Sequence, residues 1–129
     1  MITGKTLFML FVVLFLGLAV ASPAHASTCT PLTLSITPST ATEFEPVTIS
    51  NSVSNCSSSA KVVKVTVNLT ADTASCGDYS ESFSFKVFLR ANKSRTFTFI
   101  LPAPPCKGTY TDSESSSNGG TATATLTVD

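Results

Sequence analysis

The segment Lys61 to Thr70, in which apolar and polar side chains alternate from Val63 onward, is the feature that most constrains the fold of this chain. The odd positions from 63 to 69 are Val or Leu, whereas the even positions from 64 to 68 are Lys, Thr and Asn. A period of two is that of a β-strand, because successive side chains point to opposite sides of a sheet. The segment is therefore predicted to be an antiparallel strand with one buried and one solvated face.

Six further segments repeat this pattern, and turn residues such as Pro, Gly, Ser and Asn separate them. They cover Leu32–Thr37, Val47–Val53, Ser82–Arg90, Arg95–Leu101, Gly108 to about Ser113, and Thr121–Val128. Beyond the first residues of the chain, no window has the period of a helix. Seven strands at this spacing predict an all-β, antiparallel sandwich with a core sufficient for one domain.

The sixth segment departs from the alternation, because every position from Asp112 to Ser117 is polar. It is either a strand paired through its backbone alone or a loop, and the sequence leaves both open. Asn118-Gly119-Gly120 fits the tight turn that would join it to the last strand. Tyr110 is expected to anchor its start, with the ring in the core and the hydroxyl on a backbone partner.

The first 26 residues have the composition of a secretory signal peptide. Lys5 precedes an apolar run from Leu7 to Ala21, and Ala24-His25-Ala26 supplies a small-x-small cleavage site. The run is shorter than the roughly 20 apolar residues of a membrane span, which disfavours an uncleaved anchor. We therefore predict a signal peptide at 1–26 and one domain at 27–129, secreted to the extracellular space or the periplasm.

The charge of the domain excludes several partners. Without Lys5, it retains seven basic side chains against eight acidic ones. Such a balance offers no basic field for nucleic acid and no polybasic patch for anionic lipid. The mature chain is thus expected to have no nucleic-acid partner, no stable membrane span and no cofactor.

Four cysteines in a small exported chain predict disulfides. In an antiparallel sandwich with short connections, the chain changes end at each strand. Cys29 and Cys56 then fall at one end, and Cys76 and Cys106 at the other. We predict the bonds Cys29–Cys56 and Cys76–Cys106, each contributing about 3 to 4 kcal/mol, mainly by restricting the unfolded chain.

Three strings carry a resemblance to a known class of domains: SSSAKVVKVTVNL, FKVFLRANKSRTFTFILPAPPCKGTYT and NGGTATATLTVD. They resemble the immunoglobulin-like repeat domains of secreted bacterial proteins, in particular the cell-adhesion-related and PKD-like types. The resemblance runs from about Thr33 onward, and TDSESSS departs from it. It implies a seven-stranded, fibronectin-III-like sandwich and a role in adhesion, spacing or ligand presentation.

Catalysis is not expected. Removal of the signal peptide takes away His25, the only histidine, and the disulfides consume every thiol. Asp112 and Glu114 have the chemistry of a glycosidase carboxylate pair, but so small a sandwich has little room for a substrate cleft.

Surface residues suggest two weak sites and several inert features. Four acidic residues fall in loops at the Cys76–Cys106 end and are weak calcium candidates: Glu43, Glu45, Asp72 and Asp78. The simpler interpretation is that they are solvated surface carboxylates. Four basic residues around one turn favour a solubilising edge, or a weak contact with an anionic polysaccharide: Lys86, Arg90, Lys93 and Arg95. Val62, Phe88 and Ile100 are interpreted as isolated exposed apolar residues. Sequons occur at Asn55, Asn68 and Asn92.

Three hypotheses about function follow. The first is a non-catalytic exported module for binding, adhesion or spacing at the cell surface, with a surface protein or glycan as partner. The second is a structural subunit that self-assembles by strand donation into a groove beside the incompletely filled sixth strand. The third is a carrier of a small apolar ligand, in a cavity lined by Phe83, Phe85, Phe97 and Phe99.

Overall fold

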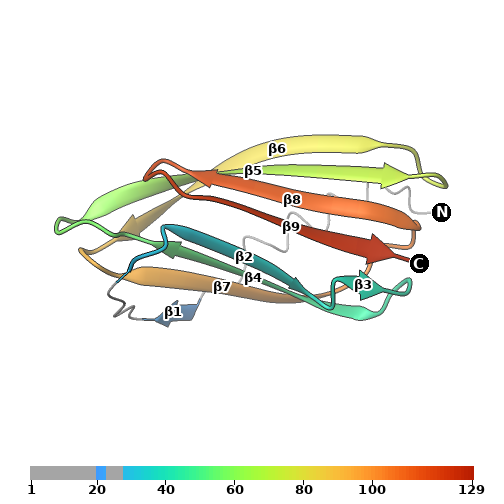
Figure 1. Cartoon of the computed structure of the whole chain (residues 1–129), viewed down its shortest axis with the longest axis horizontal. Helices are drawn as coiled ribbons and strands as arrows, with labels where there is room; N and C mark the ends of the chain where they lie inside the picture. Colours follow the sequence, from blue (N-terminus) through green and yellow to red (C-terminus); the bar gives the residue numbers. More distant parts are fainter. Residues whose placement is uncertain (1–19, 23–27) are drawn as a thin grey trace.

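Two facing β-sheets form the part of the chain that the computed structural model describes, residues 20–22 and 28–129 (Figure 1). One sheet has the strand order β1-β7-β4-β2 and the other β3-β9-β8-β5-β6. All neighbours pair antiparallel except β3 and β9. The strands are β1 (Val20–Ser22), β2 (Leu32–Thr37), β3 (Thr40–Ala41), β4 (Pro46–Ser54), β5 (Lys61–Thr73), β6 (Tyr79–Leu89), β7 (Ser94–Pro102), β8 (Gly108–Ser116) and β9 (Thr121–Val128).

Eight strands follow residue 28, one more than the seven predicted. Seven of them occupy the predicted segments. The additional strand, β3, has only two residues, which pair with the end of β9. A strand this short has no periodic pattern that the sequence could show. The predicted signal peptide lies outside the described residues except for β1, which pairs with the first residues of β7. Within the described ranges, no helix is long and apolar enough to cross a membrane.

The predicted alternation accounts for the core. Inward residues of β4 and β5 such as Ile49, Val65 and Val67 are at most 1% exposed, and they pack between the sheets. The outward positions of both sheets carry mostly Ser and Thr, and some of these hydroxyls bond across strands. Thr96 Oγ1, for example, donates to Ser52 Oγ over 3.2 Å. The outer faces of both sheets are therefore polar, and the buried apolar side chains lie between the sheets.

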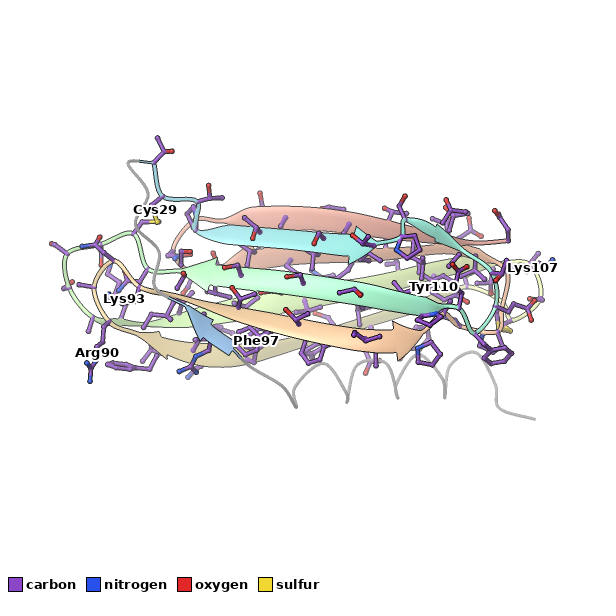
Figure 2. All side chains as sticks on the ribbon, turned by 90° about the horizontal axis from the view of Figure 1, so that it is seen from below. Cys29, Arg90, Lys93, Phe97, Lys107 and Tyr110 are labelled. Carbon is purple, nitrogen blue, oxygen red and sulfur yellow. A yellow bond between two sulfur atoms is a disulfide. The ribbon has the colours of Figure 1, made fainter. Side chains whose placement is uncertain are left out.

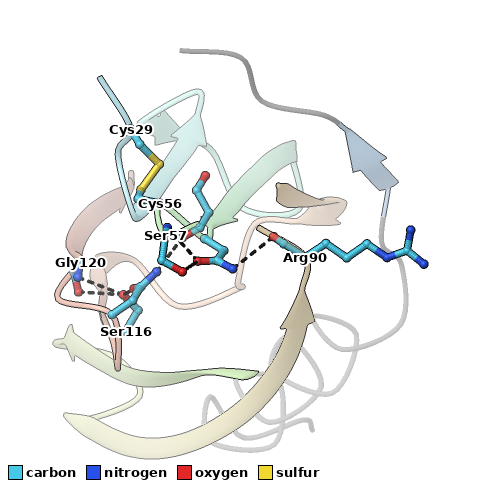
Figure 3. The surroundings of a disulfide bond; sticks show 9 residues. Cys29, Cys56, Ser57, Arg90, Ser116 and Gly120 are labelled. Carbon is cyan, nitrogen blue, oxygen red and sulfur yellow. Dashed lines mark hydrogen bonds between the residues drawn. A yellow bond between two sulfur atoms is a disulfide. The ribbon is translucent and has the colours of Figure 1, made fainter. Parts of the chain in front are cut away.

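Two disulfides close opposite ends of the sandwich, in the pairs that strand reversal predicts. Cys29 is bonded to Cys56 with their Cα atoms 5.6 Å apart, and Cys76 to Cys106 at 5.9 Å. Figure 3 shows the first bond beside the loop that carries Ser57.

The polar sixth segment is a strand with an inward face. β8 is hydrogen-bonded to β5 along one edge and to β9 along the other, so it has no vacant edge for a donated strand. Tyr110 is buried and its hydroxyl donates to the carbonyl of Cys106 over 2.7 Å, as expected of an anchor. The next two inward residues are Asp112 and Glu114, which are 5% and 3% exposed. The apolar pattern is missing because two acids occupy core positions.

The start of β8 requires glycine, and this makes a testable prediction. Gly108 has φ of 150°, and a Cβ there would lie 2.2 Å from the carbonyl oxygen of Asp72. We expect Gly108→Ala to lower the free energy of unfolding by about 2 to 3 kcal/mol, measured by urea denaturation. Gly77→Ala is the matched control, since Gly77 also has positive φ (75°) but open space around it. An equal loss in both variants would contradict the predicted backbone clash.

Candidate functional site

Basic and acidic side chains are separated between the two ends of the sandwich. Figure 2 shows Arg90 and Lys93 at the end that holds Cys29, and Lys107 at the opposite end. Six of the seven basic residues of the domain belong to the strands and turn at the Cys29 end: Lys61, Lys64, Lys86, Arg90, Lys93 and Arg95. We call this the basic end. The loops at the Cys76–Cys106 end carry most of the exposed acids.

The basic end contains two lysines that lie directly opposite each other on neighbouring strands. Lys64 of β5 lies directly opposite Lys86 of β6 in the register, and both are exposed on the outer face of the sheet. Like charges at facing positions of an antiparallel pair repel each other. An anion bound at this position would relieve that repulsion.

An apolar pair adjoins the two lysines. Val62 and Phe88 are 58% and 59% exposed, and they face each other across β5 and β6 in the row next to Lys64 and Lys86. The interpretation of these two residues as isolated is therefore wrong: strand register makes them neighbours. Ile100, 72% exposed, lies on β7 in the other sheet and is separate from them.

A hollow of about 240 Å³ lies on the other side of the basic end. Its lining is mostly hydroxyl and amide side chains with one cation, and it includes Thr28, Thr33, Ser52, Ser54, Asn92 and Lys93. Hydroxyls and amides can both donate and accept hydrogen bonds, which suits a polar, hydroxylated ligand.

The four calcium candidates do not converge into one site. Glu45 Oε2 accepts a hydrogen bond from the backbone N–H of Thr42 in its own turn, over 2.8 Å. Asp72 and Asp78 line a shallow open hollow with Tyr79 and neighbouring hydroxyls. Among the described residues, no group of three or more His, Cys, Asp or Glu side chains could hold a metal ion.

The four phenylalanines proposed to line a ligand cavity pack into the interior instead. Phe99 is 2% exposed, and Phe83, Phe85 and Phe97 are half-buried against the same core. The rings of Phe85 and Phe97 meet edge to face with centroids 5.8 Å apart, a favourable arrangement for aromatic pairs.

A polar cluster lies between the two sheets. Asn51 of β4 is fully buried, and its Nδ2 donates a hydrogen bond to Glu114 Oε2 of β8. One oxygen on each member has no hydrogen-bond partner among the described residues: Asn51 Oδ1, Asp112 Oδ1 and Glu114 Oε1. We call these three residues the buried polar cluster.

Burial dominates the electrostatics of this cluster. It raises the pKa of Asp112 to about 7, while a hydrogen bond with Glu114 acts in the opposite direction. The pKa of Glu114 is raised to about 8, mainly by burial and next by the negative charge of Asp112; the hydrogen bond from Asn51 acts in the opposite direction. Both shifts have the sign expected when a carboxyl group leaves water.

No known protein family and no curated protein matches the sequence. Solved structures do match. A CARDB domain from Pyrococcus furiosus, in complex with di-metal ions, has a TM-score of 0.53 at 19% identity, over 78% of this chain and 97% of that one. The fold is an immunoglobulin-like sandwich.

The same immunoglobulin-like sandwich matches parts of larger proteins. An alkylpurine DNA glycosylase from Pseudomonas fluorescens has a TM-score of 0.59 at 12% identity, over 77% of this chain and 30% of that one. A cycloisomaltooligosaccharide glucanotransferase from Paenibacillus sp. has a TM-score of 0.56 at 18% identity, over 85% and 14%. This chain thus spans less than a third of either protein, and the likeness concerns the fold alone.

Sequence reasoning missed Asn51 and misjudged the role of its partners. Asn51 interrupts an otherwise apolar inward series between Ile49 and Val53, and that interruption is the signal that could have found it. The sequence suggests Asp112 and Glu114 only as a carboxylate pair with glycosidase chemistry. Their spacing of two residues places them on one face of a strand, but only the structure shows that this face points into the core.

Proposed function

We propose that this chain is a non-catalytic, exported immunoglobulin-like module that adheres to an anionic glycan at a cell surface through its basic end. The fold supports a binding or spacing module, and two disulfides suit a non-reducing, extracellular environment. The observation that carries the proposal is the exposed row of Lys64 and Lys86, directly opposite each other and flanked by Val62 and Phe88.

The chemistry of the basic end favours a glycan that carries carboxylate or sulfate groups. Cations at Lys64, Lys86 and the Arg90–Lys93 turn supply attraction, while the hydroxyl-lined hollow beside Lys93 supplies hydrogen bonds. The acidic residues lie toward the other end, so the net charge of the domain understates the local field. Charge segregation of this kind orients an approaching polyanion.

Binding to a sulfated polysaccharide tests this function. We expect the purified protein to be retained on heparin-agarose but not on plain agarose, and to elute as salt screens the contact. Lys86→Glu should lower the salt concentration needed for elution. Lys107→Glu makes the same change of charge on an exposed lysine at the opposite end, and it should leave elution nearly unchanged.

Two results would contradict the proposal. Equal weakening by Lys86→Glu and Lys107→Glu would mean that only the net charge matters. Retention on plain agarose would mean that the charges are not involved. Sedimentation across a wide range of protein concentration tests self-assembly separately, and reversible growth into dimers or fibres would favour that alternative.

A further inference from the structure

Two acids and an amide occupy the middle of an otherwise apolar interior. Asp112 and Glu114 are inward residues of β8, a strand paired on both edges, and Asn51 of the facing sheet contacts Glu114. In the register, Asp112 lies between Leu69 and Ala124, and Glu114 between Val67 and Ala122. The flanking strands therefore offer these carboxyl groups only apolar side chains.

Among the described residues, no cationic side chain forms an ion pair with the cluster. The titratable side chains that share the inward sides of the strands are Tyr110 of β8, Tyr79 and Glu81 of β6, Arg95 of β7, and Lys61 at the exposed start of β5. The hydroxyl of Tyr110 donates to Cys106, and that of Tyr79 donates to Glu81. Arg95 is half-buried beyond Phe97, and within residues 28–129 it forms no ion pair with Asp112 or Glu114.

The space beside Asp112 is too small for water to solvate a charged carboxylate fully. The cavity beside Asp112 has a volume of about 20 Å³, and its lining is mainly apolar, including Ile36, Leu69 and Leu126. A cavity of this size has room for about one water molecule. Two adjacent carboxylates would thus lose nearly all of their hydration without a compensating charge, which is strongly unfavourable.

We propose that Asp112 and Glu114 form a proton-binding site in the core, where the folded domain holds a shared proton on the pair at neutral pH. A proton on one carboxyl turns it into a donor, and unpartnered oxygens are available on the other carboxyl and on Asn51. The proton is the smallest ligand that removes the like-charge repulsion, and it needs no further coordinating groups.

This site makes the stability of the sandwich depend on pH. The folded-state pKa values, about 7 for Asp112 and about 8 for Glu114, lie above the ordinary 3.8 and 4.5. The unfolded chain therefore releases these protons at lower pH than the folded one does. Their stabilising contribution is full below about pH 4 and is lost as the pH rises through 7 to 8. Because β8 lies within its sheet and is paired on both sides, we expect the loss to affect the whole sandwich.

The test combines unfolding with detection of the proton in the folded state. For the purified, disulfide-bonded protein, we expect the urea midpoint to fall by about 2 M between pH 5 and pH 9. Infrared difference spectra at pH 6.5 should show the C=O band of a protonated carboxyl. The double variant Asp112→Asn/Glu114→Gln keeps shape and size without titration, so both signals should disappear. Glu43→Gln/Asp78→Asn, at exposed positions, should keep both.

Three outcomes would overturn the proposal. They are a midpoint that does not change with pH, the absence of a protonated-carboxyl band at pH 6.5, and stabilisation at pH 8.5 by calcium or sodium that the double variant lacks. The last would identify a metal cation as the ligand instead. If the double variant does not fold, the infrared spectrum of the unmodified protein and the single variant Asp112→Asn decide the question.

Discussion

Asn55→Ala is expected to destabilise the domain by about 3 to 5 kcal/mol, because it removes a buried amide that joins two loops. Asn55 is 1% exposed. Its Nδ2 donates to the carbonyls of Ser59, Leu89 and Arg90 over 2.8, 3.1 and 3.2 Å, and its Oδ1 accepts from the backbone N–H of Ser57 over 3.0 Å. Two of these hydrogen-bond partners, Ser57 and Arg90, are labelled in Figure 3.

Asn68→Ala provides the control for this prediction. Asn68 is exposed on the outer face of β5, and its replacement should change the free energy of unfolding by less than about 0.5 kcal/mol. Urea denaturation of both variants at one pH measures the difference. Similar losses at 55 and 68 would show that the buried hydrogen bonds of Asn55 make no net contribution to stability.

The burial of Asn55 also makes the first sequon inaccessible in the folded domain, whereas Asn68 and Asn92 are exposed.

Removal of the Cys76–Cys106 bond is expected to have the second large effect. The double variant Cys76→Ser/Cys106→Ser should lose about 3 to 4 kcal/mol from the freer unfolded chain, plus about 1 to 2 kcal/mol for a buried hydroxyl at 106. Cys106 is 2% exposed, and its carbonyl accepts a hydrogen bond from the hydroxyl of Tyr110. The bond therefore also supports the anchor at the start of β8.

The other disulfide gives a matched comparison. Cys29→Ser/Cys56→Ser opens a bond of nearly the same sequence separation, 27 residues against 30, but both of its cysteines are exposed. The unfolded-state contributions should therefore be nearly equal, and the difference between the variants should report the burial of Cys106. Urea denaturation under non-reducing conditions measures both. A larger loss for the Cys29–Cys56 variant would contradict this account.

The sequence alone predicted the seven long strands and the cysteine pairing. Alternation with a period of two is a local property, and Gly, Pro and Ser mark where each strand ends. Chain reversal at every strand then assigns each cysteine to an end of the sandwich without knowledge of the sheets. These predictions needed only residues close together in the chain and one topological rule.

The tertiary structure alone decided which residues meet across strands and across the interior. Val62 and Phe88 became neighbours through the register of β5 and β6, and β3 exists only because the end of β9 is there to pair with it. The meeting of Asn51 with Glu114 depends on which strands of the two sheets face each other. A polar run such as Asp112 to Ser117 looks like solvent-exposed chain by composition. The strands on both sides of β8 hold it in the sheet, and its acids consequently point into the core.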